Sequence, residues 1–594
     1  MAYFRRGKKG MIKTLAKSIR EYKKASILAP LIIACEVILE CCIPFVATLL
    51  INAIDLPEGE TIEISIVVKY GLILIGLAVA SLCCGALAGH FAAIASCGFA
   101  KNLRHDIFKK IQGFSFANMD KFSTAGLVTR LTTDVTYVQM SYMMIIRSAV
   151  RSPLMLIVAT IMAMRVSSSM WFAFAIIIPF LALGLIFITI KAFPIFKTVF
   201  KKYDALNNSV QENVSGMRVV KSFVREDYER EKFAKASDDV KKGFTRAEKI
   251  LALNNPLMQM AFNGLMLMVC YFGSRLIIGT NEAALDVAGF SALLTYGAQI
   301  LMSLMMLSMI FVTMAISVES ANRIAEVLNE ESAIKNPEAP ITDIPDGSIL
   351  FDKVSFSYSK DAEKQALSNI NLFIGAGETV GIVGGTGSGK TSLVQLISRL
   401  YDVSEGAVKV GGIDVRDYDV ESLRNEVAVV LQKNVLFSGT IKENLRWGDA
   451  NASDEDIVRV CKLAAADEFV SSFPDGYDTM ITQGGTNVSG GQKQRLCIAR
   501  ALLKKPKVLI LDDSTSAVDT KTDALIRRAF AEEIPDTTKI IIAQRISSVE
   551  HADKIVVLNN GAIESVGKHE ELLSSSPIYR EIYESQTKGA SENG

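Results

Sequence analysis

A glycine-rich run that ends in Gly-Lys-Thr-Ser is the segment of this sequence best suited to chemistry. It comprises Gly384, Gly385, Thr386, Gly387, Ser388, Gly389, Lys390, Thr391 and Ser392. The apolar runs 378–383 and 393–400 flank it, which predicts a buried strand before it and a helix after it. Glycines let backbone N–H groups curl around phosphates, Lys390 would neutralise the β- and γ-phosphate oxygens, and the Thr391 hydroxyl would ligate magnesium. The run therefore predicts a site for ATP and Mg²⁺.

Two downstream segments offer groups that complete such a site. The apolar run 508–512 predicts a strand that delivers Asp512 at its end, where a carboxylate can hold Mg²⁺ beside the phosphates. The second segment lies between the glycine-rich run and Asp512. It comprises Ser489, Gly490, Gly491 and Gln492, at the start of a predicted helix. A glycine pair there suits a simple turn, but a serine and backbone amides at a helix N-terminus are also suited to hold a phosphate.

Six apolar stretches are long enough to cross a bilayer: 27–54, 70–95, 141–166, 170–192, 256–279 and 290–315. The second-to-third and fourth-to-fifth connections are long and basic, with Lys101, Arg104, Lys109, Lys110, Lys121, Lys201 and Lys202, so they should be cytoplasmic. The first-to-second and fifth-to-sixth connections are short and acidic, with Asp55, Glu58, Glu60, Glu63, Glu282 and Asp286. Both chain termini are therefore expected inside the cell.

Composition excludes several classes of protein. The chain has 594 residues of which 50% are hydrophobic, too long and too apolar for one soluble domain. Its formal net charge of +1 gives no basic surface for a nucleic-acid partner. The nine cysteines have no CxxC spacing and no histidine set, so we expect no disulfide framework and no metal cluster. The apolar run after the basic N-terminus is too long and lacks a small-residue cleavage pattern, so we expect no cleaved signal peptide.

The pattern divides the chain into five parts. Residues 1–25 are basic and suit a helix on the inner membrane surface, although a plain charged tail is the alternative. Residues 26–326 form the transmembrane part with long cytoplasmic helix extensions, and the proline-bearing stretch 327–347 is a linker. A nucleotide-binding domain occupies 348–585, and 586–594 is a polar tail.

These motifs, in this order, resemble the ATP-binding cassette (ABC) family, and the six-span half resembles the exporter-type transmembrane domain of that family. The resemblance implies a six-helix α-helical transmembrane domain fused to an α/β P-loop cassette, and an ABC-type transport ATPase. In that family two cassettes dimerise head to tail, with each ATP between one phosphate loop and the signature motif of the other subunit. Tyr358 would then stack on adenine, and Gln432 would sense Mg²⁺ and the attacking water. Ser489 to Gln492 would complete the site of the partner, and Asp519 would bridge the two sites.

Two positions depart from the family pattern. The residue after the magnesium-binding aspartate, usually a glutamate that acts as base, is Asp513, and the usual switch histidine is Gln544. An aspartate carboxylate falls about 1 Å short of the base position, and such a misplacement can cost about 100-fold in rate. Glutamine donates a hydrogen bond but carries no titratable proton. The resemblance is therefore to the degenerate subunit of bacterial heterodimeric multidrug exporters. A homodimer that tolerates both residues is the alternative.

Other segments bear on coupling and on cargo. The segments 119–126 and 216–223 resemble the coupling helices of the family. Glu36 and Glu40 lie one helical turn apart in the first span, and they would either bind cationic substrates or pair with Arg147 or Arg151. The sixth span carries five methionines that suit either a promiscuous apolar cavity or helix packing: Met302, Met305, Met306, Met309 and Met314.

The expected function is export of a small amphipathic compound, such as a drug, a lipid or a peptide, across a bacterial inner membrane. The expected partners are a second half-transporter and membrane lipid. A siderophore-type importer of the same fold is one alternative. A hydrolysis-deficient ATP-binding regulator is the other, and it is suggested by Asp513 and Gln544.

Overall fold

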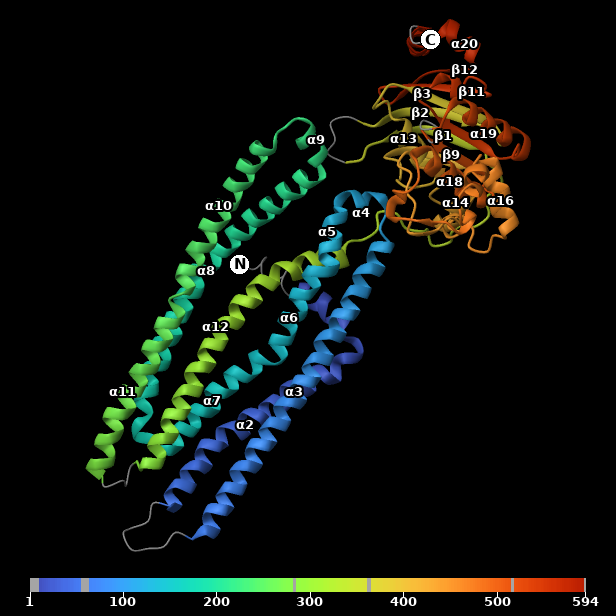
Figure 1. Ribbon diagram of the computed structural model, residues 1–594. Coiled ribbons are helices and arrows are strands. Elements are labelled where there is room, and N and C mark those ends of the chain that lie inside the picture. The colour runs from blue at the N-terminus through green and yellow to red at the C-terminus, as the bar shows by residue number, and fades with distance from the viewer. Residues whose placement is uncertain (1–9, 55–62, 281–284, 360–364, 514–517, 592–594) are drawn as a thin grey trace. The chain divides into compact units, whose positions relative to one another are not determined.

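The computed structural model describes residues 10–54, 63–280, 285–359, 365–513 and 518–591 (Figure 1). The chain divides into two compact units. Residues 1–113 and 123–330 form the first, here called the helical unit, and residues 114–122 and 331–594 form the second, here called the α/β unit. The short segment 114–122 thus belongs with a unit whose other residues come much later in the chain.

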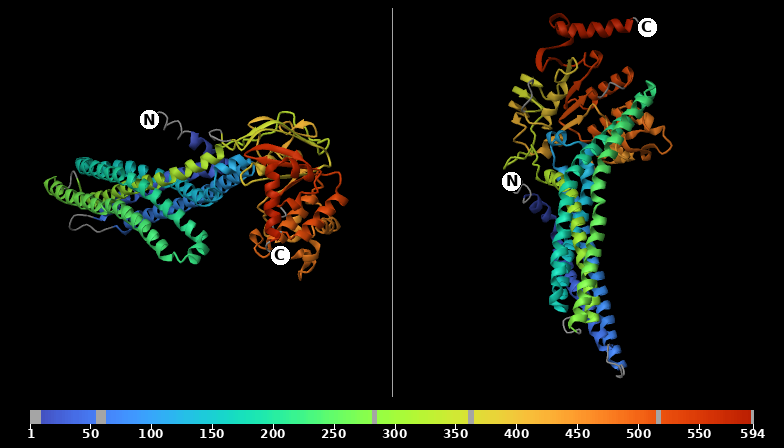
Figure 2. Two further views of the ribbon diagram at one scale, coloured as in Figure 1. Left: turned by 90° about the horizontal axis from the view of Figure 1, so that it is seen from above. Right: turned by 90° about the vertical axis from the view of Figure 1, so that its left-hand side faces the viewer.

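Long helices make up the helical unit (Figures 1 and 2). Those that carry the spans are α2 (Lys23–Ile54), α3 (Ile64–Gln112), α6 (Val135–Ile146), α7 (Ser148–Val166), α8 (Trp171–Ser215), α10 (Glu226–Leu251), α11 (Asn254–Thr280) and α12 (Val287–Asn329). Short elements join them: η1 (Lys17–Tyr22), α5 (Thr124–Thr129), the π-helical turn η2 (Arg130–Asp134), η3 (Ser168–Met170) and α9 (Met217–Ser222). In the described residues, 6 helices are long and apolar enough to cross a membrane. The six predicted spans all lie along these helices.

Several helices extend beyond the apolar stretches that predicted them. The helix α3 continues to Gln112, and α8 continues to Ser215, where its sequence has become polar. The helix α10 is polar along one face and packs beside α8, so the two form a long pair (Figure 1). Toward the spans, α2, α7, α8, α11 and α12 share one apolar core, in which Tyr296 is fully buried.

The parts of the polar connections that the structure describes are anchored locally. At the N-terminal side, residues 10–16 are helical and lead into η1, where Arg20 forms an ion pair with Asp106 of α3. The side chain of Asp286 caps α12 by accepting a hydrogen bond from the Gly289 N–H at 2.6 Å. Some residues behind the predictions for these segments lie outside the described residues: Arg5, Arg6, Lys8 and Lys9 of the basic segment 1–25, and Asp55, Glu58, Glu60 and Glu282 of the acidic connections.

Parallel strands form the centre of the α/β unit. In the described residues, a 6-stranded sheet has the order β12-β11-β3-β10-β9-β6. Its strands are β3 (Thr379–Gly384), β6 (Val427–Val430), β9 (Val508–Asp512), β10 (Thr538–Ile542), β11 (Lys554–Asn559) and β12 (Ala562–Gly567), and only β12 runs antiparallel to its neighbour. Strands β9, β10 and β11 are mostly apolar, and their apolar residues enter two different core clusters in alternation. Both faces of this sheet are therefore buried, as is usual for parallel sheets.

Two smaller sheets and a set of helices complete the α/β unit. The described residues give a 4-stranded antiparallel sheet of β1 (Ile349–Phe356), β2 (Leu367–Ile374), β4 (Glu405–Val410) and β5 (Ile413–Asp414), and a pair of β7 (Gly439–Thr440) and β8 (Met480–Ile481). The helices are α4 (Phe116–Lys121), α13 (Lys390–Ile397), α14 (Val420–Glu426), α15 (Ile441–Leu445), α16 (Asp454–Leu463), α17 (Asp467–Ser471), α18 (Gly490–Leu503), α19 (Thr520–Glu533), α20 (His569–Ser575) and α21 (Pro577–Ser591). The turns η4 (Gly476–Asp478), η5 (Gln483–Gly485) and η6 (Ile546–Ser548) lie between them.

Candidate functional site

The glycine-rich run forms a tight turn between β3 and α13, as its flanking sequence predicts. Gly384 and Gly389 have φ angles of +154° and +97°, which only glycine adopts readily. A side chain at Gly384 would place its Cβ 2.2 Å from the Leu558 carbonyl oxygen, and one at Gly389 would lie 2.7 Å from the Ala366 oxygen. The turn therefore requires glycine at both ends, and the N-terminus of α13 opens directly from it.

Lys390 folds back over this turn. Its Nζ donates hydrogen bonds to the carbonyl oxygens of Gly384 at 2.9 Å and Gly385 at 2.8 Å, and it lies 3.5 Å from Ser388 Oγ. Burial lowers the pKa of this ammonium, and the nearby carboxylates of Asp512 and Asp513 oppose that shift. The arrangement holds a cation over the same loop whose backbone N–H groups could receive phosphate oxygens.

Thr391 and Asp512 meet although they lie far apart in the sequence. The Thr391 hydroxyl donates a hydrogen bond to Asp512 Oδ1 at 3.2 Å. Asp512 is the last residue of β9 and is only 2% exposed. Burial raises the pKa of its carboxyl, and the hydrogen bond from Thr391 acts in the opposite direction. A hydroxyl and a carboxylate side by side fit Mg²⁺, which commonly takes few protein ligands and completes its shell with water and phosphate oxygens. Among the described residues no cluster of three histidine, cysteine or acidic side chains offers an alternative metal site.

The two positions that depart from the family pattern contact each other. The Gln544 side-chain amide donates a hydrogen bond to Asp513 Oδ2 at 2.8 Å. Asp513 has a left-handed φ of 50° and is 8% exposed, and its N–H donates to the Ile542 carbonyl oxygen at 3.0 Å. Its own carbonyl oxygen accepts a hydrogen bond from Gln494 of α18 at 3.4 Å. Backbone and carboxylate of Asp513 are thus both held by neighbouring elements.

The aromatic residue expected to stack on adenine is part of an aromatic cluster. Tyr358 is 53% exposed, and its hydroxyl lies 2.9 Å from Ser392 Oγ. Its ring meets the ring of Tyr401 edge to face, with centroids 5.2 Å apart. The Tyr401 hydroxyl in turn donates to Asp120 Oδ2 of α4 at 2.6 Å, and burial together with this bond raises the pKa of Tyr401. Sequence reasoning missed Tyr401, because no motif marks it.

The remaining predicted residues lie on exposed surfaces of the α/β unit. Gln432 is exposed in the loop that follows β6, the neighbour of β9. Ser489 caps α18 in a reciprocal arrangement with Gln492, and the two adjoining glycines form the first turn of this helix. Asp519 caps α19 by accepting hydrogen bonds from the Thr522 N–H and hydroxyl, which lower its pKa. Asp519 therefore has a local role in the fold, whatever role it has between two cassettes. Ser516 and Ala517, which come shortly before Asp519 in the sequence, lie outside the described residues.

A second cluster of charged groups lies within the spans of the helical unit. Arg151 of α7 forms ion pairs with Glu36 and with Glu40 of α2, the latter at 2.6 Å. The three side chains remain 34%, 13% and 31% exposed, respectively. Of the two expectations for the glutamates, the contacts match pairing with Arg151, and the cluster keeps one carboxylate charge in excess when all three groups are ionised.

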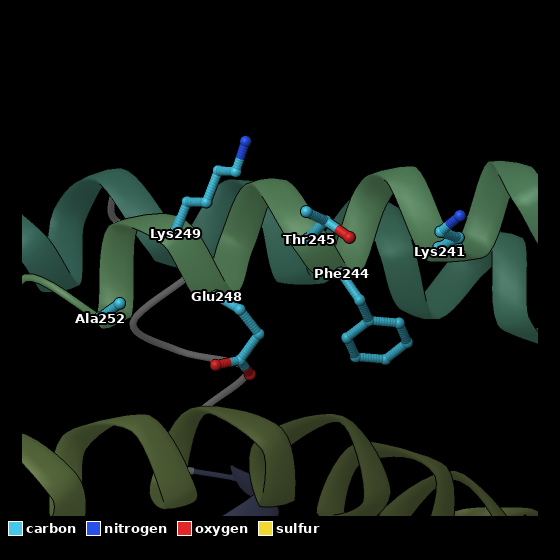
Figure 3. A pocket seen from close by; sticks show the side chains of 6 residues that line it. All are labelled: Lys241, Phe244, Thr245, Glu248, Lys249 and Ala252. Atoms are coloured by element: carbon cyan, nitrogen blue, oxygen red, sulfur yellow. The ribbon is translucent and has the colours of Figure 1, made fainter.

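A hollow beside α10 carries no comparable chemistry. Lys241, Phe244, Thr245, Glu248, Lys249 and Ala252 line it; five belong to α10 and Ala252 follows its last residue. Figure 3 shows Phe244 and Glu248 pointing to one side and Lys249 to the other. The side chains do not converge on a common point, and we assign no ligand to this hollow. The methionines of α12 are largely exposed in the single chain, with Met302 64% and Met309 59% exposed.

The chain is similar to proteins of one family along nearly its whole length. Residues 30–305 match the family described as ABC transporter transmembrane region, and residues 367–516 match the family described as ABC transporter. The uncharacterised ABC transporter ATP-binding protein YfiB of Bacillus subtilis is 37% identical over 517 residues, which cover 87% of this chain and 89% of that protein. Rv1273c of Mycobacterium tuberculosis, of the same description, is 34% identical over 589 residues, 98% of this chain and 100% of that protein.

A solved structure has the same fold. The structure of a bacterial Atm1-family ABC exporter with ATP bound superposes with a TM-score of 0.82, covering 95% of this chain and 99% of the other at 23% identity. The likeness extends over both units, so the fold class expected from the sequence is confirmed.

Proposed function

The chain belongs to the ABC transporter family, as a six-span domain fused to one cassette, and we propose that it is the slow-site subunit of a heterodimeric exporter. The observation that carries the proposal is the hydrogen bond of 2.8 Å between Gln544 and Asp513. The two residues that depart from the family pattern thus act on one another, at the place where the base for the attacking water belongs.

ATP is the proposed substrate of the cassette. Lys390 would bind the β- and γ-phosphate oxygens, and the N–H groups of the turn that ends at Gly389 would bind the others. Tyr358 would stack on the adenine through the exposed part of its ring. Thr391 and Asp512 would hold Mg²⁺, which when bound neutralises charge on the phosphates. Gln432, in the loop after β6, would orient the attacking water.

Hydrolysis at this site should be slow for two reasons. Asp513 is one methylene shorter than the usual glutamate, so its carboxylate would stand about 1 Å from the productive position. One of its oxygens also accepts the Gln544 N–H, which leaves less capacity to accept a proton from water. Gln544 can still donate a hydrogen bond toward a γ-phosphate, so nucleotide binding is expected to persist.

The proposed partner is a second half-transporter with the usual glutamate and histidine at the corresponding positions. Ser489 and Gly490 are exposed, Gly491 and Gln492 are partly exposed, and the reciprocal cap between Ser489 and Gln492 fixes the helix N-terminus. This surface is suited to complete the site of the partner, which would then hydrolyse ATP at the full rate. A homodimer remains the alternative, and it requires that Asp513 suffice as base.

Small amphipathic compounds are the proposed cargo, moved outward across a bacterial inner membrane with both termini in the cytoplasm. The exposed methionines of α12 suit an adaptable apolar surface. The excess carboxylate in the cluster of Glu36, Glu40 and Arg151 would favour cationic members of this class. Loss of transport of cations but not of neutral compounds in Glu36→Gln would support this assignment, and equal loss of both would oppose it.

ATPase activity in lipid tests the proposal directly. The chain is measured alone and co-expressed with its candidate partner, with Asp513→Glu beside each. We expect activity only with the partner, and an increase in turnover at this site in Asp513→Glu. Full, transport-coupled activity of the chain alone would overturn the heterodimer. ATP binding without any transport in either combination would favour the regulator, and inward transport into cells would favour the importer.

A further inference from the structure

One side chain from the C-terminal helix α21 spans the segment that carries Gln544. This segment, residues 543–545, joins the end of β10 to η6. The Gln586 Nε2 group donates a hydrogen bond to the Gln544 carbonyl oxygen at 2.8 Å. The Ile546 N–H donates to Gln586 Oε1 at 3.0 Å. A single amide therefore satisfies one backbone acceptor and one backbone donor, on either side of Arg545.

The helix α21 is itself firmly anchored in the α/β unit. Tyr579 is fully buried and its hydroxyl lies 2.7 Å from His569 Nδ1. Tyr583 packs against the core cluster that also contains Ile546. Gln586 follows these tyrosines by seven and three residues, so it lies on the same face of the helix. A packed helix thus presents Gln586 to the segment 543–545.

The contacts continue from this segment to the nucleotide site. The Gln544 side chain reaches Asp513 Oδ2 at 2.8 Å, while the backbone of Gln544 is held by Gln586. Glutamine has a long and flexible side chain, so the position of its amide depends on how well its backbone is fixed. The bonds from Gln586 supply that restraint from outside the catalytic motifs.

We infer that Gln586 is a positioning residue of the nucleotide site, which acts through Gln544 and sets how strongly the site prefers ATP over ADP. The inference rests on the proposed function, in which Gln544 faces the γ-phosphate. ADP lacks that phosphate, so an imprecisely placed Gln544 weakens binding of the triphosphate alone. One typical hydrogen bond contributes about 0.5–1.5 kcal/mol, which corresponds to about 2- to 10-fold in affinity.

The test compares nucleotide affinities in the assembled transporter in lipid. The partner cassette carries a phosphate-loop lysine-to-alanine change, so that only the site of this chain binds. Displacement of a fluorescent ATP analogue by AMP-PNP and by ADP, each with Mg²⁺, gives the ratio of the two affinities. Gln586→Leu removes both bonds, and Gln586→Glu keeps only the acceptor for the Ile546 N–H. Ser585→Ala is the matched control, because Ser585 Oγ bonds the Ile582 carbonyl oxygen within the same helix.

We expect the AMP-PNP to ADP ratio to fall about 3- to 10-fold in Gln586→Leu and less in Gln586→Glu, with ADP affinity unchanged. The control should equal the wild type. In a Gln544→Ala background, Gln586→Leu should have no further effect. The inference is overturned if Gln544→Ala lowers the ratio and Gln586→Leu does not, or if Gln586→Leu acts equally in the Gln544→Ala background. If Gln544→Ala itself leaves the AMP-PNP to ADP ratio unchanged, the proposed role of Gln544 at the γ-phosphate is wrong, and the inference about Gln586 is overturned as well.

Discussion

The contact between Tyr401 and Asp120 allows a quantitative prediction about α4. This helix has six residues and is too short to persist without its contacts. The hydrogen bonds that hold it within the α/β unit include Tyr401 OH to Asp120 at 2.6 Å, Asn118 Nδ2 to the Glu331 oxygen at 2.9 Å, and the Ala333 N–H to Asn118 Oδ1 at 3.1 Å. Release of α4 from these partners should therefore unfold it.

Tyr401→Phe removes one of these bonds and leaves the rings in place. The Tyr401 residue is 9% exposed and its ring meets the ring of Phe116 edge to face, a contact that phenylalanine preserves. A hydrogen bond to a charged group is worth about 1.5–3 kcal/mol, and the lower end applies because the exposed Asp120 carboxylate regains water. A loss of about 1.5 kcal/mol raises the population of released α4 about tenfold.

Amide hydrogen exchange of the whole transporter in lipid measures that population. The Met119 N–H donates to the carbonyl oxygen of the N-cap Ser115, and the Phe122 N–H donates to that of Asn118, so both exchange only when the helix opens. We expect their exchange to accelerate about tenfold in Tyr401→Phe. Tyr418→Phe is the control, since that buried hydroxyl bonds the Val410 oxygen elsewhere in the unit and should leave α4 unchanged. Equal exchange in Tyr401→Phe and wild type would refute the reasoning.

Three further single substitutions and one double variant test the charged groups of both units. Burial raises the pKa of Asp512, so the folded state binds a proton at this carboxyl more tightly than the unfolded state and loses stability as pH rises. Asp512→Asn should therefore raise the melting temperature of the nucleotide-free protein at neutral pH and weaken the dependence of that temperature on pH. Arg323→Leu leaves the carboxylate of Asp134, 1% exposed, without its ion-pair partner, and should cost about 2 kcal/mol in thermal unfolding, less than a fully buried pair. Arg151→Gln should lower stability in detergent by about 3 kcal/mol, and a second change, Glu36→Gln, should restore part of the loss.

The fold was largely predictable because its signals are local and strong. A span needs about 20 apolar residues, and each of the six stretches meets that length. The ends of the helices were less visible: α3 runs from Ile64 to Gln112, whereas hydropathy marked only 70–95. Outside the bilayer a helix does not need apolar residues on all its faces. A polar continuation such as α10 can therefore be recognised only by the periodicity of its apolar residues.

The candidate site divides in the same way between local and distant information. Lys390 and Thr391 follow from one continuous run, and the apolar run 508–512 marks Asp512 as the carboxylate beside the phosphate loop. Gln544 and Asp513 each follow the end of a strand. They meet because β9 and β10 are parallel neighbours in which Asp512 lies opposite Ile542. Gln586 gave no such signal, since an exposed glutamine near a C-terminus is ordinary and its partners are backbone groups.

The helix α18 connects the two halves of the proposed mechanism. Its N-terminus carries Ser489 to Gln492, which would complete the site of the partner, and its Gln494 is 4% exposed and donates to the backbone oxygen of Asp513. A displacement of α18 on closure of the partner site would therefore act on Asp513 in the chain's own site. A glutamate at position 513 would keep this backbone bond and alter only the carboxylate. In Asp513→Glu, closure of the partner's site should thus still affect this chain's own site, although the rate of ATP hydrolysis there changes. The variant therefore separates coupling between the sites from catalysis.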